Sequence, residues 1–188
     1  MVISREFTLS LQDMRRSILT GLLIVFLLPS CNKDNGVDTS GIATINNNLL
    51  LNQQTQNYYL YGFLFSKGEL VSSESVPPPD IIVDTDGTKL SLEANNLQNS
   101  FFLVDEYVSE SLAKNAFNSL TSATVSQWAG SATPLRTNQI WLFRSGTERY
   151  AKIRIISTTL DNTKNPDFAE CTFQWVYQPD GSLTFPGK

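Results

Sequence analysis

The sequence predicts a mainly β, antiparallel, sandwich-like domain that carries one short amphipathic helix. Only 17% of the 188 residues are charged, and uncharged polar residues such as Asn, Ser and Thr take their place. From residue 42 onward, short apolar runs alternate with turn-forming clusters, which is the pattern of short strands. The 41% hydrophobic content excludes a wholly disordered chain, and the length fits one domain.

The expected strands are short runs bounded by Gly, Pro, Asn and Asp. Pro77-Pro78-Pro79 cannot lie in a central strand, so it predicts an extended connection. Asp86-Gly87 is typical of a hairpin turn, and Gly62 indicates a bulge or a close backbone approach. The runs cover 42–45, 58–65, 69–72, 80–84, 88–92, 101–104, 139–144, 149–158, 169–178 and 183–185.

Strand alternation assigns faces in the last third of the chain. In 149–158, Ala151, Ile153 and Ile155 share one face, and Lys152 and Arg154 share the other. We expect the charged face to meet water, with contact to an anionic ligand as the alternative. In 169–178, the expected core face holds Cys171, Phe173, Trp175 and Tyr177.

One helix is expected over about 109–120. Ser109 is a suitable N-cap, and Glu110 suits the positive end of a helix dipole. The apolar side chains fall on one helical face, namely Leu112, Ala113, Ala116, Phe117 and Leu120.

The first thirty residues predict a lipoprotein signal peptide. Arg15 and Arg16 precede an apolar run over 18–28, which is too short to span a membrane. Leu28-Pro29-Ser30-Cys31 resembles a bacterial lipobox, which implies lipid on Cys31; an ordinary signal that carries a cysteine is the alternative. We therefore expect a signal over 1–30, a lipidated tether over 31–41 and a single β-rich domain over 42–188. Translation starts at Met1 or at Met14, in which case 1–13 is an upstream extension.

Asn32-Lys33-Asp34-Asn35 resembles the surface-export signal of Bacteroidota lipoproteins. The expected location is the outer membrane or cell surface, with attachment to the membrane through lipid on Cys31. A solvated tether with incidental charges is the alternative.

Composition excludes several functions. The chain has no histidine, which removes Ser-His-Asp catalysis and His-ligated metals, so we expect neither an enzyme nor a metal site. Loss of 1–30 with its three Arg and two acidic residues takes the net charge from −4 to −5. An acidic chain is a poor nucleic-acid partner, so none is expected.

Trp128 and Arg136 are the candidate ligand-binding residues. Both lie in the long connection 121–138, and an aromatic ring beside a cation suits a flat or anionic ligand. A tryptophan that fixes the loop onto the core is the alternative. Cys171 is expected in the core rather than as a nucleophile.

Two pairs of closely spaced acidic residues predict a turn and a strand end rather than functional sites. Asp84-x-Asp86-Gly87 lacks the later ligands of a calcium loop, so it predicts a turn. Asp105 and Glu106 point to opposite faces of a strand, so they predict a solvated strand end rather than a catalytic pair.

Three segments in this order resemble the HmuY-like lipoproteins of Bacteroidota. They are YGFLFSKG at 61–68 followed by PDI at 79–81, then YAKIRI at 150–155, and FQWVYQPDGS at 173–182. The resemblance covers about 58–185. It implies a mostly antiparallel β domain that captures haem and passes it to an outer-membrane receptor.

The haem ligands of that family do not carry over to this chain. The resemblance implies paired axial His or Met ligands, but His is absent and Met1 and Met14 lie in or before the signal. Tyr, Lys or Cys171 are the remaining axial candidates. The expected function is a ligand-binding surface lipoprotein for haem or another hydrophobic or anionic ligand. The alternative is a structural or accessory lipoprotein that docks on a partner protein or glycan.

Overall fold

The computed structural model describes residues 39–96 and 98–187. The expected signal over 1–30, the extension 1–13, Cys31 and the tether as far as residue 38 lie outside the described residues. The first strand begins at Ser40, two residues before the expected start of the domain.

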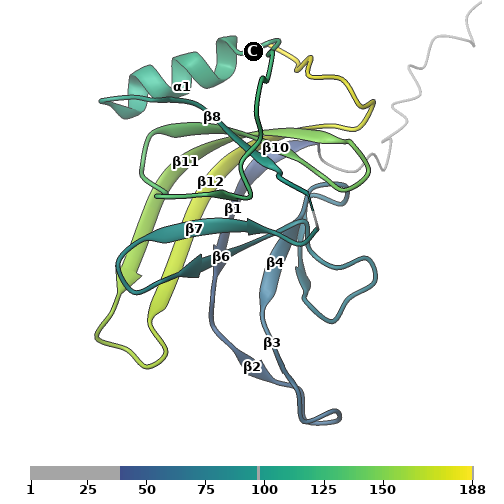
Figure 1. The fold of residues 1–188 in the computed structure, drawn as a ribbon, viewed down its shortest axis with the longest axis vertical. Coiled ribbons are helices and arrows are strands. Elements are labelled where there is room, and N and C mark those ends of the chain that lie inside the picture. The colour runs from purple at the N-terminus through teal and green to yellow at the C-terminus, as the bar shows by residue number, and fades with distance from the viewer. Residues whose placement is uncertain (1–38, 97, 188) are drawn as a thin grey trace, which may run out of the picture. The chain divides into compact units, whose positions relative to one another are not determined.

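Two five-stranded sheets pack face to face (Figure 1). Every strand pairing within them is antiparallel, which confirms the predicted sandwich-like class. The first sheet has the order β1 (Ser40–Asn46), β12 (Phe168–Gln178), β11 (Tyr150–Asp161), β10 (Gln139–Arg144) and β8 (Phe101–Glu106). The second has the order β5 (Glu69–Ser72), β4 (Tyr61–Leu64), β6 (Ile81–Thr85), β7 (Leu90–Ala94) and β9 (Ser131–Ala132).

A small ribbon of β2 (Leu50–Leu51) and β3 (Tyr58–Tyr59) extends the molecule at its lower end in Figure 1. It joins β1 of the first sheet to β4 of the second. The apolar run of 183–185 is not a strand, since Thr184 makes only an isolated bridge to Ser122.

The main core lies between the two sheets and is rich in aromatic rings. The ring centroids of Phe63 and Trp175 are 5.0 Å apart, and those of Phe65 and Phe143 are 5.2 Å apart. Each fully buried side chain of this size contributes roughly 1.5–3 kcal/mol. Ala151, Ile153 and Ile155 are buried here, as the alternation predicted.

A second cluster covers the other face of the first sheet. Helix α1 (Glu110–Ser119) lies across it, with Ser109 as N-cap, which confirms the predicted helix. Phe117 packs with Ile140, Leu142, Val176 and Phe185. Leu112 is half exposed, so the buried stripe of the helix is narrower than predicted.

The expectation that Lys152 and Arg154 face water is wrong. Lys152 is 1% exposed and Arg154 is 3% exposed, because α1 and the tail around Phe185 cover their face of β11. The Arg154 Nε donates to the Gln174 Oε1 at 3.0 Å, and its Nη1 lies 3.9 Å from the Glu110 Oε1. Burial lowers the pKa of the Arg154 guanidinium, an effect that Glu110 opposes. Neither charge is placed for an anionic ligand.

Candidate functional site

The structure gives Trp128 and Arg136 separate partners. The Trp128 ring stacks on Tyr150 with centroids 6.0 Å apart, and the Arg144 guanidinium lies 4.9 Å from the Trp128 centroid. The Arg136 Nη1 donates to the Glu106 Oε2 at 3.1 Å. Trp128 therefore fixes its loop to the second cluster, which was the alternative interpretation.

The other sequence candidates have local roles. Cys171 is fully buried, as predicted, and burial raises the pKa of its thiol. The Asp86 carboxylate accepts from the backbone amides of Thr88 and Lys89, both at 2.8 Å, which confirms the turn. Hydrogen bonds from Thr88 lower the pKa of Asp86.

A groove of about 330 Å³ lies where the β2–β3 ribbon meets the second sheet. Its lining is mostly apolar and aromatic, as in most small-molecule sites. We call it the tyrosine groove, and its residues are Leu49, Tyr58, Tyr59, Leu60, Ser73, Pro79, Ile82, Ala94 and Asn95.

Gly62 brings one wall of the groove into place. A Cβ on Gly62 would collide with the carbonyl oxygen of Ile81 and lie 2.6 Å from the Pro79 Cβ. The glycine therefore allows the start of β6 to approach β4 closely, which is one of the two interpretations that the sequence suggested. This approach places Pro79 and Ile82 in the lining of the groove.

Large apolar side chains around the groove remain open to solvent. Tyr58 is 68% exposed, Leu49 is 53% exposed and Tyr61 is 43% exposed. The Tyr59 and Tyr61 rings meet edge to face with centroids 5.8 Å apart. Burial, Tyr61 and Glu74 together raise the pKa of the Tyr59 phenol. An exposed apolar group of this kind is typical of an interaction site.

Asp80 follows the lining residue Pro79 in the chain. Its Oδ2 accepts from the Phe65 amide at 2.9 Å, and its backbone carbonyl accepts from the Asn95 amide at 3.0 Å. Burial raises the pKa of this carboxyl to about 6, although the Phe65 hydrogen bond opposes the shift. The titratable carboxyl of Asp80 therefore holds the Phe65 backbone, and the Asp80 backbone holds the lining residue Asn95.

A second, more polar groove of about 380 Å³ shares Leu49 with the first. It runs beside the tip of the β11–β12 hairpin, where Lys164 lies 4.2 Å from the Phe168 ring centroid. The Lys164 Nζ also lies 3.9 Å from the Asp161 Oδ2. Asn47 links the end of β1 to the start of β12, because its side-chain amide donates to the Asp167 carbonyl and its Oδ1 accepts from the Ala169 amide.

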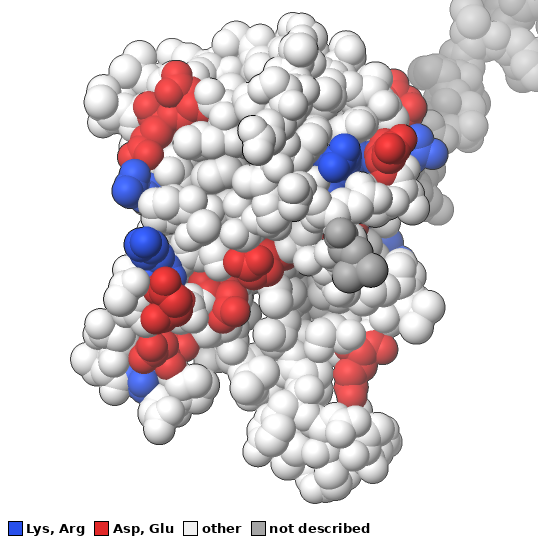
Figure 2. Space-filling model, in the orientation of Figure 1, with Lys and Arg blue, Asp and Glu red and all other residues white. Residues whose placement is uncertain are grey.

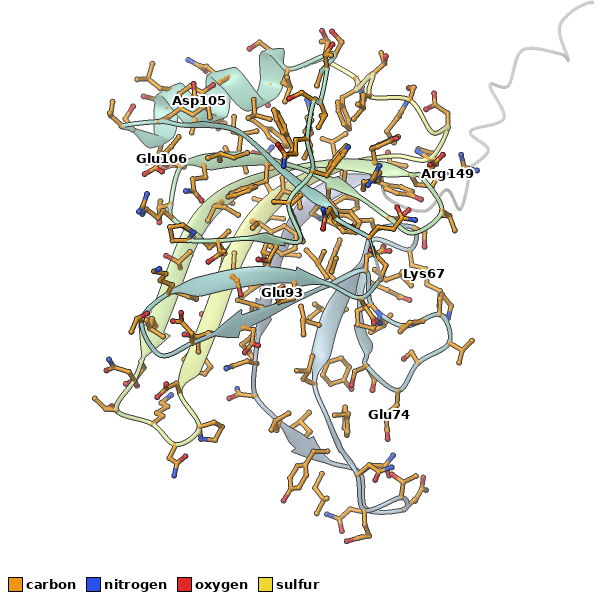
Figure 3. The ribbon with its side chains drawn as sticks, in the orientation of Figure 1. Lys67, Glu74, Glu93, Asp105, Glu106 and Arg149 are labelled. Carbon is orange, nitrogen blue, oxygen red and sulfur yellow. The ribbon has the colours of Figure 1, made fainter. Side chains whose placement is uncertain are left out.

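Charge is sparse at the ribbon end. In Figure 2 the lobe at the lower right of the visible face is largely uncharged, with an acidic group beside it. Figure 3 labels Glu74 there, close to the ribbon. The Glu74 Oε2 accepts from the Asn52 Nδ2 at 2.7 Å, which holds the carboxylate at this end.

The residues present do not fit the paired haem ligation that the resemblance implies. No His occurs in the chain, and Met1 and Met14 lie outside the described residues. The thiol of Cys171 is fully buried, which leaves only tyrosine phenols at the groove. Within residues 39–96 and 98–187, no three His, Cys, Asp or Glu side chains gather to hold a metal ion.

Sequence reasoning missed the tyrosine groove. The available signal was Leu49-Leu50-Leu51 and Tyr58-Tyr59 on either side of a polar turn. Those apolar runs could not all be buried in so short a hairpin. Among the described residues, no helix has the length and apolar character needed to cross a membrane.

Comparison with known proteins does not place the chain in a family. No protein-family model and no curated protein sequence matches it.

Proposed function

We propose that this chain is a lipid-anchored cell-surface protein that binds a flat, apolar ligand in the tyrosine groove. The observation that carries the proposal is the groove itself, with about 330 Å³ of space between aromatic and aliphatic side chains. Sites of this size and lining commonly hold small organic molecules. The role is binding rather than catalysis, since no nucleophile and base are grouped at the groove.

The anchor supports the same proposal from the sequence. Cys31 stands at the end of a lipobox-like signal, and the eight residues 32–39 separate it from Ser40, where β1 begins. A lipidated cysteine would hold the domain at the surface, where ligands of the medium reach it. Intact mass of the purified mature protein tests this step, and an unmodified Cys31 would remove the anchor.

A ligand titration tests the groove. Both clusters of buried residues lie within 45–185, so residues 32–188 contain the whole core and serve as the soluble form. We expect saturable binding of iron-free protoporphyrin and of ferrous haem, both as their uncharged dimethyl esters, with similar affinity, because no axial ligand pair is present. A haem affinity far above that of the iron-free ring would instead indicate iron ligation.

Matched variants locate the binding. Tyr58→Ala is expected to weaken binding about tenfold, since a lost aromatic contact costs about 1.4 kcal/mol. Leu112→Ala removes a similarly exposed apolar side chain from helix α1 and is expected to leave binding unchanged. Equal effects of the two changes would exclude the tyrosine groove as the site.

The exposed apolar residues of the ribbon also favour a second candidate, docking on a partner protein or glycan. Leu50 is 41% exposed and Leu51 is 38% exposed, and both lie on β2. A partner that covers them would protect their amides from hydrogen exchange, whereas a small ligand in the groove would protect mainly the β3 side. Exchange measured with and without the bound molecule separates the two candidates.

A further inference from the structure

We propose that the tyrosine groove selects flat ligands without negative charge and prefers cations. The inference rests on the proposed function and names the chemical class of its ligand. Of the hydrophobic and anionic ligands that the sequence suggested, it favours the hydrophobic class and excludes the anionic class.

The lining offers nothing to neutralise an anion. None of the nine lining residues is Lys or Arg. Lys164 lines the other groove, where Asp161 and the Phe168 ring are its neighbours. A carboxylate in the tyrosine groove would lose hydration without gaining a cationic partner, which is costly.

A negative charge is instead fixed beside the groove. Glu74 follows the lining residue Ser73, and its carboxylate is held at 2.7 Å by the Asn52 side-chain amide. Its charge acts on the lining residue Tyr59, since it adds to the raised pKa of that phenol after burial and Tyr61. An anionic ligand would meet repulsion here, and a cationic ligand would meet attraction.

The aromatic rings of the groove also favour a cationic ligand over an anionic one. The faces of tyrosine rings carry partial negative charge and attract cations within about 6 Å of the centroid. Tyr58 is largely exposed, so one of its faces is open to a ligand, and Tyr59 lines the groove beside it. Two tyrosines therefore line this small, mostly apolar space, and the carboxylate of Glu74 follows its lining residue Ser73.

Three probes with one ring system test the charge preference. Pyrenemethylammonium, pyrenemethanol and pyrenecarboxylate share a flat apolar body and differ in charge. We expect residues 32–188 to bind them in that order at 0.15 M salt, with at least a tenfold difference between the cation and the anion. Pyrene fluorescence reports each affinity.

Matched variants separate the groove from the overall negative charge of the protein. Glu74→Gln is expected to reduce the cation–anion difference to less than threefold. Glu148→Gln removes the same charge from an exposed turn between β10 and β11 and is expected to keep the full difference. Tyr58→Leu keeps apolar bulk and is expected to weaken the cation more than the neutral alcohol.

The outcomes distinguish this inference from the proposed function. If the neutral alcohol does not bind, the groove is not an apolar site, and both proposals fail. If the alcohol binds but the anion binds as tightly as the cation, only the charge preference fails. Equal effects of Glu74→Gln and Glu148→Gln would also overturn it, since the preference would then come from net charge alone.

Discussion

The Lys152 ammonium closes the C-terminal end of helix α1. Its Nζ donates to the carbonyl of Phe117 at 2.8 Å and to that of Leu120 at 2.9 Å. It also lies 4.8 Å from the centre of the Phe117 ring. The last carbonyls of a helix have no partner within the helix, so a buried strand lysine satisfies them here.

Lys152→Met is therefore expected to destabilise the fold. The substitution keeps the length of the side chain but leaves two carbonyls without their donor, at a cost of about 2 kcal/mol. Urea unfolding measures the change. Lys89→Met, at an exposed position of the β6–β7 turn, should change stability by less than about 0.5 kcal/mol. Similar losses for both variants would show that the lysine does not hold the helix end.

Asp80 is expected to make stability fall as the pH rises. Its pKa is about 6 in the folded protein, above the usual value of 3.8, so the folded state holds the proton more tightly. Its contribution is fully present below about pH 4 and is lost as the pH rises through 6.

Asp80→Asn should remove this dependence. The amide oxygen can still accept from the Phe65 amide, so the variant is expected to gain about 2 kcal/mol over the wild type at pH 7.5 and little at pH 4. Urea unfolding of both proteins at the two pH values measures the difference. A stability difference that does not change with pH would show that Asp80 titrates normally.

The sequence predicted the layers better than it predicted the site. Alternation placed Ile153 and Phe173 in the core, and the Ser109 cap fixed the start of the helix. Periodicity could not tell that the opposite face of β11 is covered, because the helix that covers Lys152 is distant in the chain. The long connection 121–138 suggested a ligand-binding role for Arg136, but its side chain pairs with Glu106 of β8. Contacts between distant segments thus decided the positions of Lys152 and Arg136.

Cys171 is expected to be inert in the native state. Its side chain is fully buried and burial raises its thiol pKa, so little thiolate is available to react. Residues 32–188 should take up a thiol reagent such as DTNB slowly when folded and one equivalent per chain in urea. Rapid reaction of the folded protein would show that the core opens easily at β12.

Gly62 links the stability of the sandwich to the shape of the groove. Gly62→Ala would force a methyl group against the Ile81 carbonyl and Pro79, so β4 and β6 must separate. We expect a loss of about 3 kcal/mol, since overpacking of this kind forces backbone shifts. Gly130→Ala is the control, because its new methyl group would meet only the Asn99 side chain at 3.6 Å.

Ligand binding should weaken together with stability in Gly62→Ala, because Pro79 and Ile82 form part of the lining of the groove. Unchanged binding in a destabilised Gly62→Ala protein would place the ligand elsewhere on the molecule.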